Sequence, residues 1–171
     1  MTKSRQTGWI IGLMCLMLAA WSVPGATLEI PLDGKSWALW GSTLETGRQG
    51  REATVARENY CPTGGCVIRL DRISVSPPRA HAGETLLLTT SYTLLTPEQI
   101  AIPITITREI FFQGQSLGKT KSTDSRQLNG AFDQQVNFQL PANAAKGTYT
   151  LVTTISTGYG QSQKTAEFQV E

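Results

Sequence analysis

Apolar and polar side chains alternate with a period of two along the C-terminal two-thirds of the chain. A period of two places every second side chain on the same face of a β-strand. Residues that favour tight turns, Gln113–Ser116 and Asn129-Gly130 among them, separate the alternating runs. The pattern predicts seven strands, at residues 68–75, 86–95, 100–112, 119–126, 132–140, 148–157 and 164–170. The clearest shared faces are Ile100, Ile102, Ile104 and Ile106 in one run and Phe132, Gln134, Val136, Phe138 and Leu140 in another.

This succession of strands predicts an all-β fold, an antiparallel β-sandwich of about seven strands. Strands do not alternate with helical segments here, which excludes a parallel α/β enzyme fold. The stretch 140–149 ends one strand, crosses between sheets and begins the next strand near Tyr149. That position suits a structural tyrosine corner, in which the Tyr149 hydroxyl bonds to backbone upstream of it.

Several of these segments together resemble a known family. They are the stretch Ile73-Ser74-Val75-Ser76-Pro77-Pro78, then Ala82-Gly83-Glu84, Leu140-Pro141 and Gly147-Thr148-Tyr149-Thr150-Leu151. The chain is similar to bacterial immunoglobulin-like and fibronectin-III-like modules of the adhesion type found in exported proteins. The resemblance covers about 100 of the 171 residues and implies an immunoglobulin-like sandwich. It departs from antibody-type domains in lacking an intersheet cysteine pair and a core tryptophan, so antigen-like recognition is not implied.

The first 26 residues have the organisation of a secretory signal peptide. Lys3 and Arg5 precede an apolar run at 9–20, and small residues follow up to a cleavage site near Gly25 or Ala26. The apolar run is shorter than the roughly 20 residues of a membrane span. An uncleaved anchor and a lipoprotein processed at Cys15 are the alternatives. We therefore expect an exported protein, in the periplasm, at the cell surface or outside the cell, with no stable membrane insertion after cleavage.

Removal of this leader changes the charge and the cysteine count. The chain has 15 basic and 13 acidic residues, and the leader contains two of the basic residues and no acidic ones. The remainder is formally neutral, and its two cysteines are Cys61 and Cys66. A neutral surface gives no sign of nucleic-acid binding.

Cys61 and Cys66 enclose the turn formers Pro62-Thr63-Gly64-Gly65. The flanking stretches 53–56 and 67–70 are predicted to pair as a hairpin that a structural disulfide closes, because disulfides form in oxidising compartments. A redox-active dithiol, which usually has two intervening residues, and a zinc site, which needs about four ligands, are the alternatives. The sequence divides into a leader (1–26), an N-terminal extension with the disulfide turn (27–66) and the sandwich (67–171).

The chain contains few residues or motifs that indicate catalysis. His81 is the single histidine and lies in a predicted turn, and no nucleophile elbow, phosphate loop, dinucleotide fingerprint or zinc-protease motif occurs. Trp37 and Trp40 are read as packing residues in preference to a ligand-stacking pair. The sequence thus predicts no enzyme, no cofactor and no metal site.

Recognition of another protein is the function that these observations favour. We expect a non-catalytic binding or structural module of the cell envelope or surface, which contacts an envelope or extracellular protein through sandwich loops or edge strands. The alternative is a secreted hydrolase inhibitor that presents its end loops to a cleft. The candidate contact residues are Pro97, Glu98, Gln113, Gly114, Gln115 and Tyr159.

Overall fold

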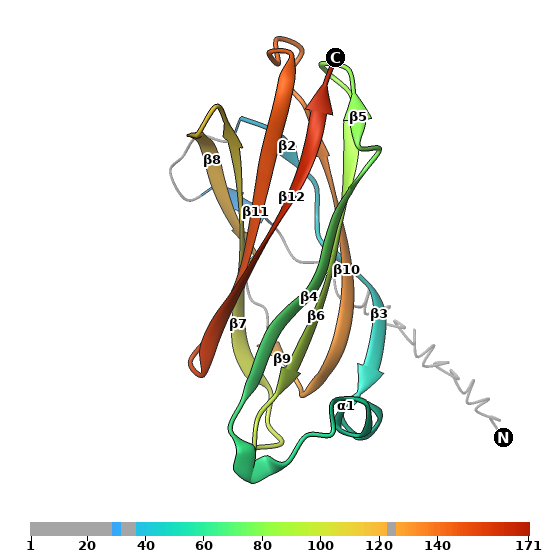
Figure 1. Ribbon diagram of the computed structural model, residues 1–171, viewed down its shortest axis with the longest axis vertical. Helices are drawn as coiled ribbons and strands as arrows, with labels where there is room; N and C mark the ends of the chain where they lie inside the picture. Colours follow the sequence, from blue (N-terminus) through green and yellow to red (C-terminus); the bar gives the residue numbers. More distant parts are fainter. Residues whose placement is uncertain (1–28, 32–36, 123–125) are drawn as a thin grey trace, which may run out of the picture.

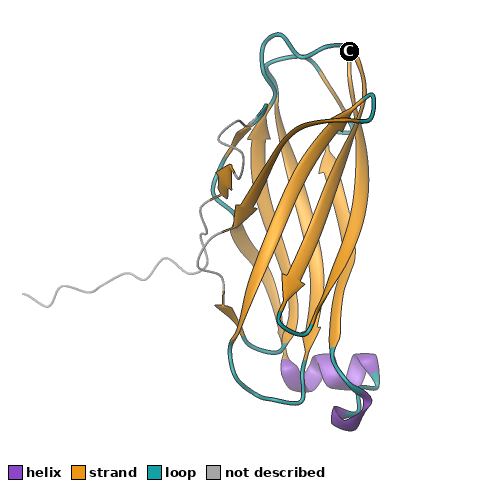
Figure 2. Cartoon of the chain, turned by 90° about the vertical axis from the view of Figure 1, so that its left-hand side faces the viewer, coloured by secondary structure: helices purple, strands orange, loops and turns teal. Residues whose placement is uncertain are grey.

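The computed structural model describes residues 29–31, 37–122 and 126–171, so the predicted leader lies outside the described residues. Two sheets face each other (Figures 1 and 2). The first has the order β1-β8-β7-β11-β12-β5 with β9 paired to β7, and the second has the order β2-β10-β6-β4 with β3 paired to β10. The elements are β1 (Glu29–Pro31), β2 (Leu39–Trp40), β3 (Leu44–Gly50), α1 (Arg51–Glu58), the 3₁₀ turn η1 (Pro62–Gly64), β4 (Val67–Ser76), β5 (Arg79–Ala80), β6 (Thr85–Leu95), β7 (Ile102–Phe112), β8 (Gln115–Ser122), β9 (Arg126–Gln127), β10 (Gly130–Gln139), β11 (Gly147–Thr157) and β12 (Gly160–Val170).

The seven long strands are the seven that the sequence predicts. In chain order they are β4, β6, β7, β8, β10, β11 and β12. The first, second and fifth share one sheet, while the third, fourth, sixth and seventh share the other. All pairings between these long strands are antiparallel. Among the described residues only the short β5 pairs in parallel, with β12. Constant-type immunoglobulin domains divide their strands in the same way with one exception. Their fourth strand belongs to the sheet of the first, second and fifth strands, whereas the fourth strand here, β8, pairs with β7 in the other sheet.

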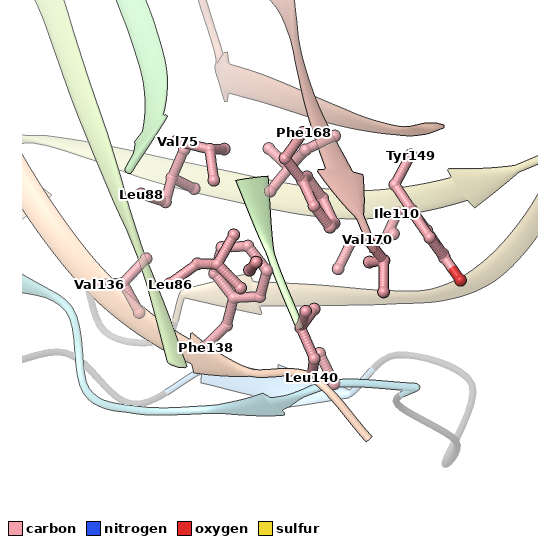
Figure 3. Packing of buried hydrophobic residues seen from close by; sticks show 13 residues of the cluster. Val75, Leu86, Leu88, Ile110, Val136, Phe138, Leu140, Tyr149, Phe168 and Val170 are labelled. Carbon is pink, nitrogen blue, oxygen red and sulfur yellow. The ribbon is translucent and has the colours of Figure 1, made fainter. Parts of the chain in front are cut away.

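The core contains two groups of apolar side chains stacked along the length of the sandwich. One group, shown in Figure 3, includes Leu86, Leu88, Val136, Phe138, Leu151 and Phe168. The other includes Leu70, Tyr92, Leu94, Ile106, Phe132 and Ile155. Ile102, Ile104 and Ile106 are buried as the alternation predicts, but Ile100 is exposed because β7 begins only at Ile102.

A buried polar layer separates the two apolar groups. Each of the four central strands supplies its polar residue at the same level, between the apolar residues of the two groups. These residues are Thr90 of β6, Arg108 of β7, Gln134 of β10 and Thr153 of β11, all at most 3% exposed. The Gln134 side chain donates a hydrogen bond to the Tyr92 hydroxyl (3.0 Å), and Arg108 donates to Ser122 Oγ (3.3 Å). The hydroxyls of Thr90 and Thr153 are buried without a hydrogen-bond partner among the described residues.

Replacing Thr153 with valine is expected to raise the free energy of unfolding by about 1 kcal/mol, because the substitution keeps the shape and removes a buried hydroxyl that has no partner. Urea unfolding of the purified protein measures the change. Thr154→Val, on the opposite and less buried face of β11, is the matched control and should change stability by less. A loss of stability in Thr153→Val would contradict the unpaired state of this hydroxyl.

The N-terminal segment pairs with both sheets. β1 extends the first sheet by pairing with β8, and β2 and β3 pair along one edge of β10. The approach of β3 to β10 requires a glycine, because a Cβ on Gly130 would lie 2.5 Å from the Gln49 carbonyl oxygen. The sequence assigns residues 27–66 to an extension and residues 67–171 to the sandwich. In the structure, the extension supplies the strands β1, β2 and β3 to the two sheets.

Two aromatic predictions also hold. The Tyr149 hydroxyl donates a hydrogen bond to the Ala145 carbonyl oxygen (2.7 Å), four residues upstream, as a tyrosine corner requires. Trp37 stacks on Tyr149 and Trp40 stacks on Phe138, each with ring centroids 4.9 Å apart, so both tryptophans pack against the core.

The two predicted turns behave differently. Gln113 and Gly114 connect β7 to β8 as a two-residue hairpin, and both have positive φ, as a type I′ turn needs. Asn129-Gly130 does not close a hairpin, because β9 and β10 lie in different sheets.

The described residues contain no helix long and apolar enough to cross a membrane.

Candidate functional site

One end of the sandwich contains the helix and several loops with polar and exposed side chains. It contains α1, the 59–66 segment, the 96–101 loop, residues 128–129 and the turn at 158–159; we call it the α1 end (Figures 1 and 2). The opposite end, called the far end, contains the C-terminus (Figure 1) and, from the strand register, the Gln113-Gly114 turn.

α1 replaces a strand that the sequence predicts at 53–56. Thr54, at the centre of the predicted strand, is buried and donates its hydroxyl hydrogen to the Gly50 carbonyl oxygen (2.8 Å). Asn59 ends the helix in the left-handed conformation, and the Tyr60 N–H bonds to the Val55 carbonyl oxygen (3.0 Å). The hairpin prediction is therefore wrong. The tertiary contacts of this helix outweigh the weak strand propensity of a four-residue run.

A network of charged and polar side chains fixes α1 on the outer face of the second sheet. Arg57 donates to Thr93 Oγ1 (2.9 Å), whose hydroxyl donates to Asp71 Oδ2 (2.6 Å). Arg69 bridges Asp71 and Glu58, with 2.9 Å between its Nη1 and Glu58 Oε2. Hydrogen bonds from Arg69 and Arg57 hold the pKa of the Glu58 carboxyl below its ordinary value. This network positions the helix against β4 and β6.

Glu58→Gln tests the network through its pH dependence. We expect a loss of about 1 kcal/mol of stability at pH 7, discounted because the two arginines are nearly half exposed. The pKa of Glu58 is lowered by folding, so its contribution is present above its ordinary pKa of 4.5 and is lost as the pH falls through the lower folded pKa. The difference between variant and wild type should shrink in acid. Glu52→Gln, an exposed position on the same helix, is the control; an equal loss at every pH would contradict the role of the charge.

Asn129 joins two segments of the α1 end. Its side chain is 5% exposed, and its Oδ1 accepts hydrogen bonds from the backbone N–H and the hydroxyl of Thr96, both at 3.1 Å. Its Nδ2 donates to the carbonyl oxygens of Thr96 (2.9 Å) and Glu98 (2.8 Å). Asn129 is not among the residues that the sequence predicts for a site, because Asn followed by Gly is typical of a turn. One buried amide thus binds three backbone groups of the 96–101 loop, and Arg126 adds a hydrogen bond to the Ala101 carbonyl oxygen (3.0 Å).

A surface hollow of about 280 Å³ lies between α1 and these loops. It is lined by Arg48, Gly50, Arg51, Gln99, Leu128 and Asn129. Arg48 is engaged on several sides: it pairs with Glu45 (3.5 Å), donates to Gln127 (2.8 Å) and lies 5.0 Å from the centroid of the Phe132 ring. Leu128 of this lining is 50% exposed. Two other large side chains at the same end are exposed as well, Ile100 at 59% and Tyr159 at 43%.

The candidate contact residues divide between the two ends. Pro97, Glu98 and Tyr159 lie at the α1 end, where partial burial and the neighbouring Glu98 carboxylate raise the pKa of Tyr159. The other three, Gln113, Gly114 and Gln115, lie at the far end. The structure thus brings together half of the predicted contact residues. It adds Ile100, Leu128, Arg48 and Arg51 to the same end, from segments that are distant in the sequence.

The cysteine segment also differs from the prediction. Cys61 and Cys66 are free, exposed thiols, so the predicted disulfide is absent from the structure. Hydrogen bonds already close the turn between them: the Gly64 N–H donates to the Cys61 carbonyl oxygen (2.8 Å), and the Tyr60 hydroxyl donates to that of Gly65 (2.6 Å). The predicted turn is present as η1, and it does not depend on a covalent link.

Other candidate chemistry is sparse. His81 is exposed in its turn, where its backbone N–H donates to Glu84 Oε2 (2.8 Å). Among the described residues, His, Cys, Asp and Glu side chains do not gather in groups of three or more that could bind a metal ion.

Comparison with known proteins shows similarity in fold alone. No family model matches the chain, and no curated protein matches it. The chain is similar to the alkylpurine DNA glycosylase AlkC of Pseudomonas fluorescens, at 12% identity and a TM-score of 0.46, over 61% of this chain and 30% of that one. It is also similar to a CARDB domain from Pyrococcus furiosus (14% identity, TM-score 0.35, 60% of this chain and 89% of that one). A type I cohesin from Pseudobacteroides cellulosolvens matches at 9% identity and a TM-score of 0.33, over 63% of this chain and 92% of that one.

These TM-scores lie below 0.5, so the functions of the matched proteins are not transferred. The chain spans less than a third of the glycosylase. The two-sheet β-sandwich rests on the strand pairing of this chain itself.

Proposed function

We propose that this protein is a non-catalytic binding module, of the bacterial immunoglobulin-like or fibronectin-III-like type, whose α1 end contacts another protein. One observation carries the proposal: Ile100, Leu128 and Tyr159 are all exposed at that end, which also contains a hollow lined by Arg48 and Arg51. Apolar and aromatic side chains next to arginine are enriched in protein interfaces.

The α1 end is also organised before any partner binds. Asn129 fixes the 96–101 loop, and the network around Glu58 and Arg69 fixes α1. Binding to loops that are already ordered costs less conformational entropy than binding to loops that must be ordered.

The sheet edges offer less to a partner. β1 covers part of the outer edge of β8, and β3 covers β10. β3 itself contains Glu45, Arg48 and two glycines, and its register with β10 shifts between Asp133 and Gln134. Charges and bulges of this kind discourage the addition of a further strand, so loop contacts are favoured over edge pairing.

The proposed setting is the cell envelope or the cell surface. It rests on the signal-peptide pattern of residues 1–26, and the partner would then be an envelope or extracellular protein. Detection of a shortened chain in the periplasmic or extracellular fraction tests this part independently of any binding experiment.

Crosslinking in the native envelope tests the binding proposal, with two variants compared at equal expression. Ile100→Asp combined with Tyr159→Ser changes the α1 end, and Gln113→Ala combined with Gln115→Ala changes the far end as the matched control. We expect a specific crosslinked partner with wild type and with the far-end variant, and its loss with the α1-end variant. Loss of the crosslinked partner with the far-end variant alone would place the contact at the far end and contradict the proposal. Inhibition of a hydrolase by the purified protein would favour the inhibitor alternative.

A further inference from the structure

The segment between α1 and β4 presents two thiols at the surface of the α1 end. Cys61 and Cys66 are both exposed and unbonded, and four residues separate them. A Cβ built on Gly65, which has a φ of +98°, would meet no atom within 4 Å. Because both cysteines are exposed, a small molecule can reach the thiols from solvent.

Cys61 has an environment that favours the thiolate. Its Sγ lies 3.0 Å from the hydroxyl oxygen of Thr63. This hydroxyl, with backbone hydrogen bonds from Thr63 and Gly64, lowers the pKa of the Cys61 thiol. A thiol with a lowered pKa is ionised to a greater extent at neutral pH, and the thiolate is the nucleophilic form.

We propose that Cys61 and Cys66 form a thiol–disulfide exchange site that reacts with small disulfides of the glutathione type. The Cys61 thiolate attacks one sulfur of the small disulfide, which forms a mixed disulfide and releases one thiolate. The Cys66 thiolate then attacks Cys61 Sγ, which forms the Cys61–Cys66 bond and releases the second thiolate. The small disulfide is the oxidant: its sulfur–sulfur bond is reduced to two thiols while the two cysteines are oxidised and lose their protons to solvent.

The four-residue turn is suited to the second step. Gly64 and Gly65 adjoin Cys66, and glycine gives the backbone freedom to bring Cys66 within the Cα separation of roughly 4.4–6.8 Å that a disulfide requires. The connection between α1 and β4 carries no long-range strand pairing at residues 61–66. Closure of the bond can therefore be confined to this turn, and it does not depend on the proposed partner binding.

Reaction with glutathione disulfide, followed by intact mass, tests the proposal. All proteins carry Cys15→Ser so that only Cys61 and Cys66 react. The protein with both thiols should lose two hydrogens and carry no stable glutathione. Cys66→Ser should accumulate one glutathione per chain, and Cys61→Ser should react at least several-fold more slowly than Cys66→Ser. Stable glutathione addition with both cysteines present, or equal rates in the two single variants, would overturn the proposal.

Thr63→Val separates a positioning role from a structural one. In the Cys66→Ser background, the rate of Cys61 alkylation is measured as a function of pH. Replacing Thr63 should shift the midpoint of this profile to higher pH, because the hydroxyl that stabilises the thiolate is absent. Circular dichroism should show the same fold in both proteins. An unchanged pH profile would show that Thr63 does not set the reactivity of Cys61.

Discussion

Replacing Tyr149 with alanine is expected to lower the free energy of unfolding by about 3–5 kcal/mol, the largest effect among the substitutions considered. The side chain is 1% exposed and is surrounded by aromatic rings. Its ring centroid lies 4.5 Å from that of Phe112, 4.9 Å from that of Trp37 and 5.3 Å from that of Phe168. Removal of the ring leaves a cavity between β7, β11 and β12 and releases Trp37 from its packing.

Tyr149→Phe isolates the tyrosine corner from the ring packing. It keeps the aromatic contacts and deletes only the hydrogen bond to the Ala145 carbonyl oxygen, so the expected loss is about 1 kcal/mol. Urea unfolding measures all the variants. Tyr159→Ala, at an exposed tyrosine, is the matched control and should change stability much less than either Tyr149 variant. Equal losses in Tyr149→Phe and Tyr149→Ala would show that the hydrogen bond, and not the packing of the ring, dominates.

Asn129→Ala is expected to cost about 2–3 kcal/mol, because it leaves the buried backbone groups of Thr96 without partners. Stability is one measurement, and hydrogen exchange is the second. The amides of the 96–101 loop should exchange faster, since the loop has lost the amide that fixes it, while those of β11 should change only as far as global stability does.

Two variants control this result. Asn143→Ala removes an exposed asparagine and should have little effect on either measurement. Asn129→Asp keeps the size and the acceptor but loses the two donor hydrogens, so it should remain well below wild type. If Asn129→Ala left the exchange of the 96–101 loop unchanged, the loop would be held by other contacts. Weaker partner crosslinking by Asn129→Ala, measured where the protein is still folded, would connect the order of the loop to the proposed function.

Features that depend on interactions over a few residues could be predicted from the sequence. Alternation in β10 predicts the buried face that contains Phe132, Gln134, Val136 and Phe138, because strand geometry alone determines which side chains share a face. The Gln113-Gly114 hairpin was also predictable, since its two residues of positive φ are a local requirement. β8 is a strand, as the sequence predicts, but it starts at Gln115 instead of near Lys119.

The failures concern features that depend on distant segments. Residues 53–56 suit a strand by propensity, yet they form a helix whose Arg57 contacts Thr93 on β6. Asn129-Gly130 has the composition of a hairpin turn, but its two residues serve the 96–101 loop and the close approach of β3. The disulfide was inferred from spacing and compartment, whereas the structure closes the turn with hydrogen bonds.

The sequence by itself determined the number of long strands, their buried faces, the tyrosine corner and the turn at Gln113, since periodicity and backbone conformation act over a few residues. Only the tertiary structure decided the pairing of β2 and β3 with β10, the polar layer at Thr90, Arg108, Gln134 and Thr153, and the gathering of Ile100, Leu128 and Tyr159 at one end. Each of these joins segments that are far apart in the chain. Their free energy comes from contacts between segments, which no local pattern of residues encodes.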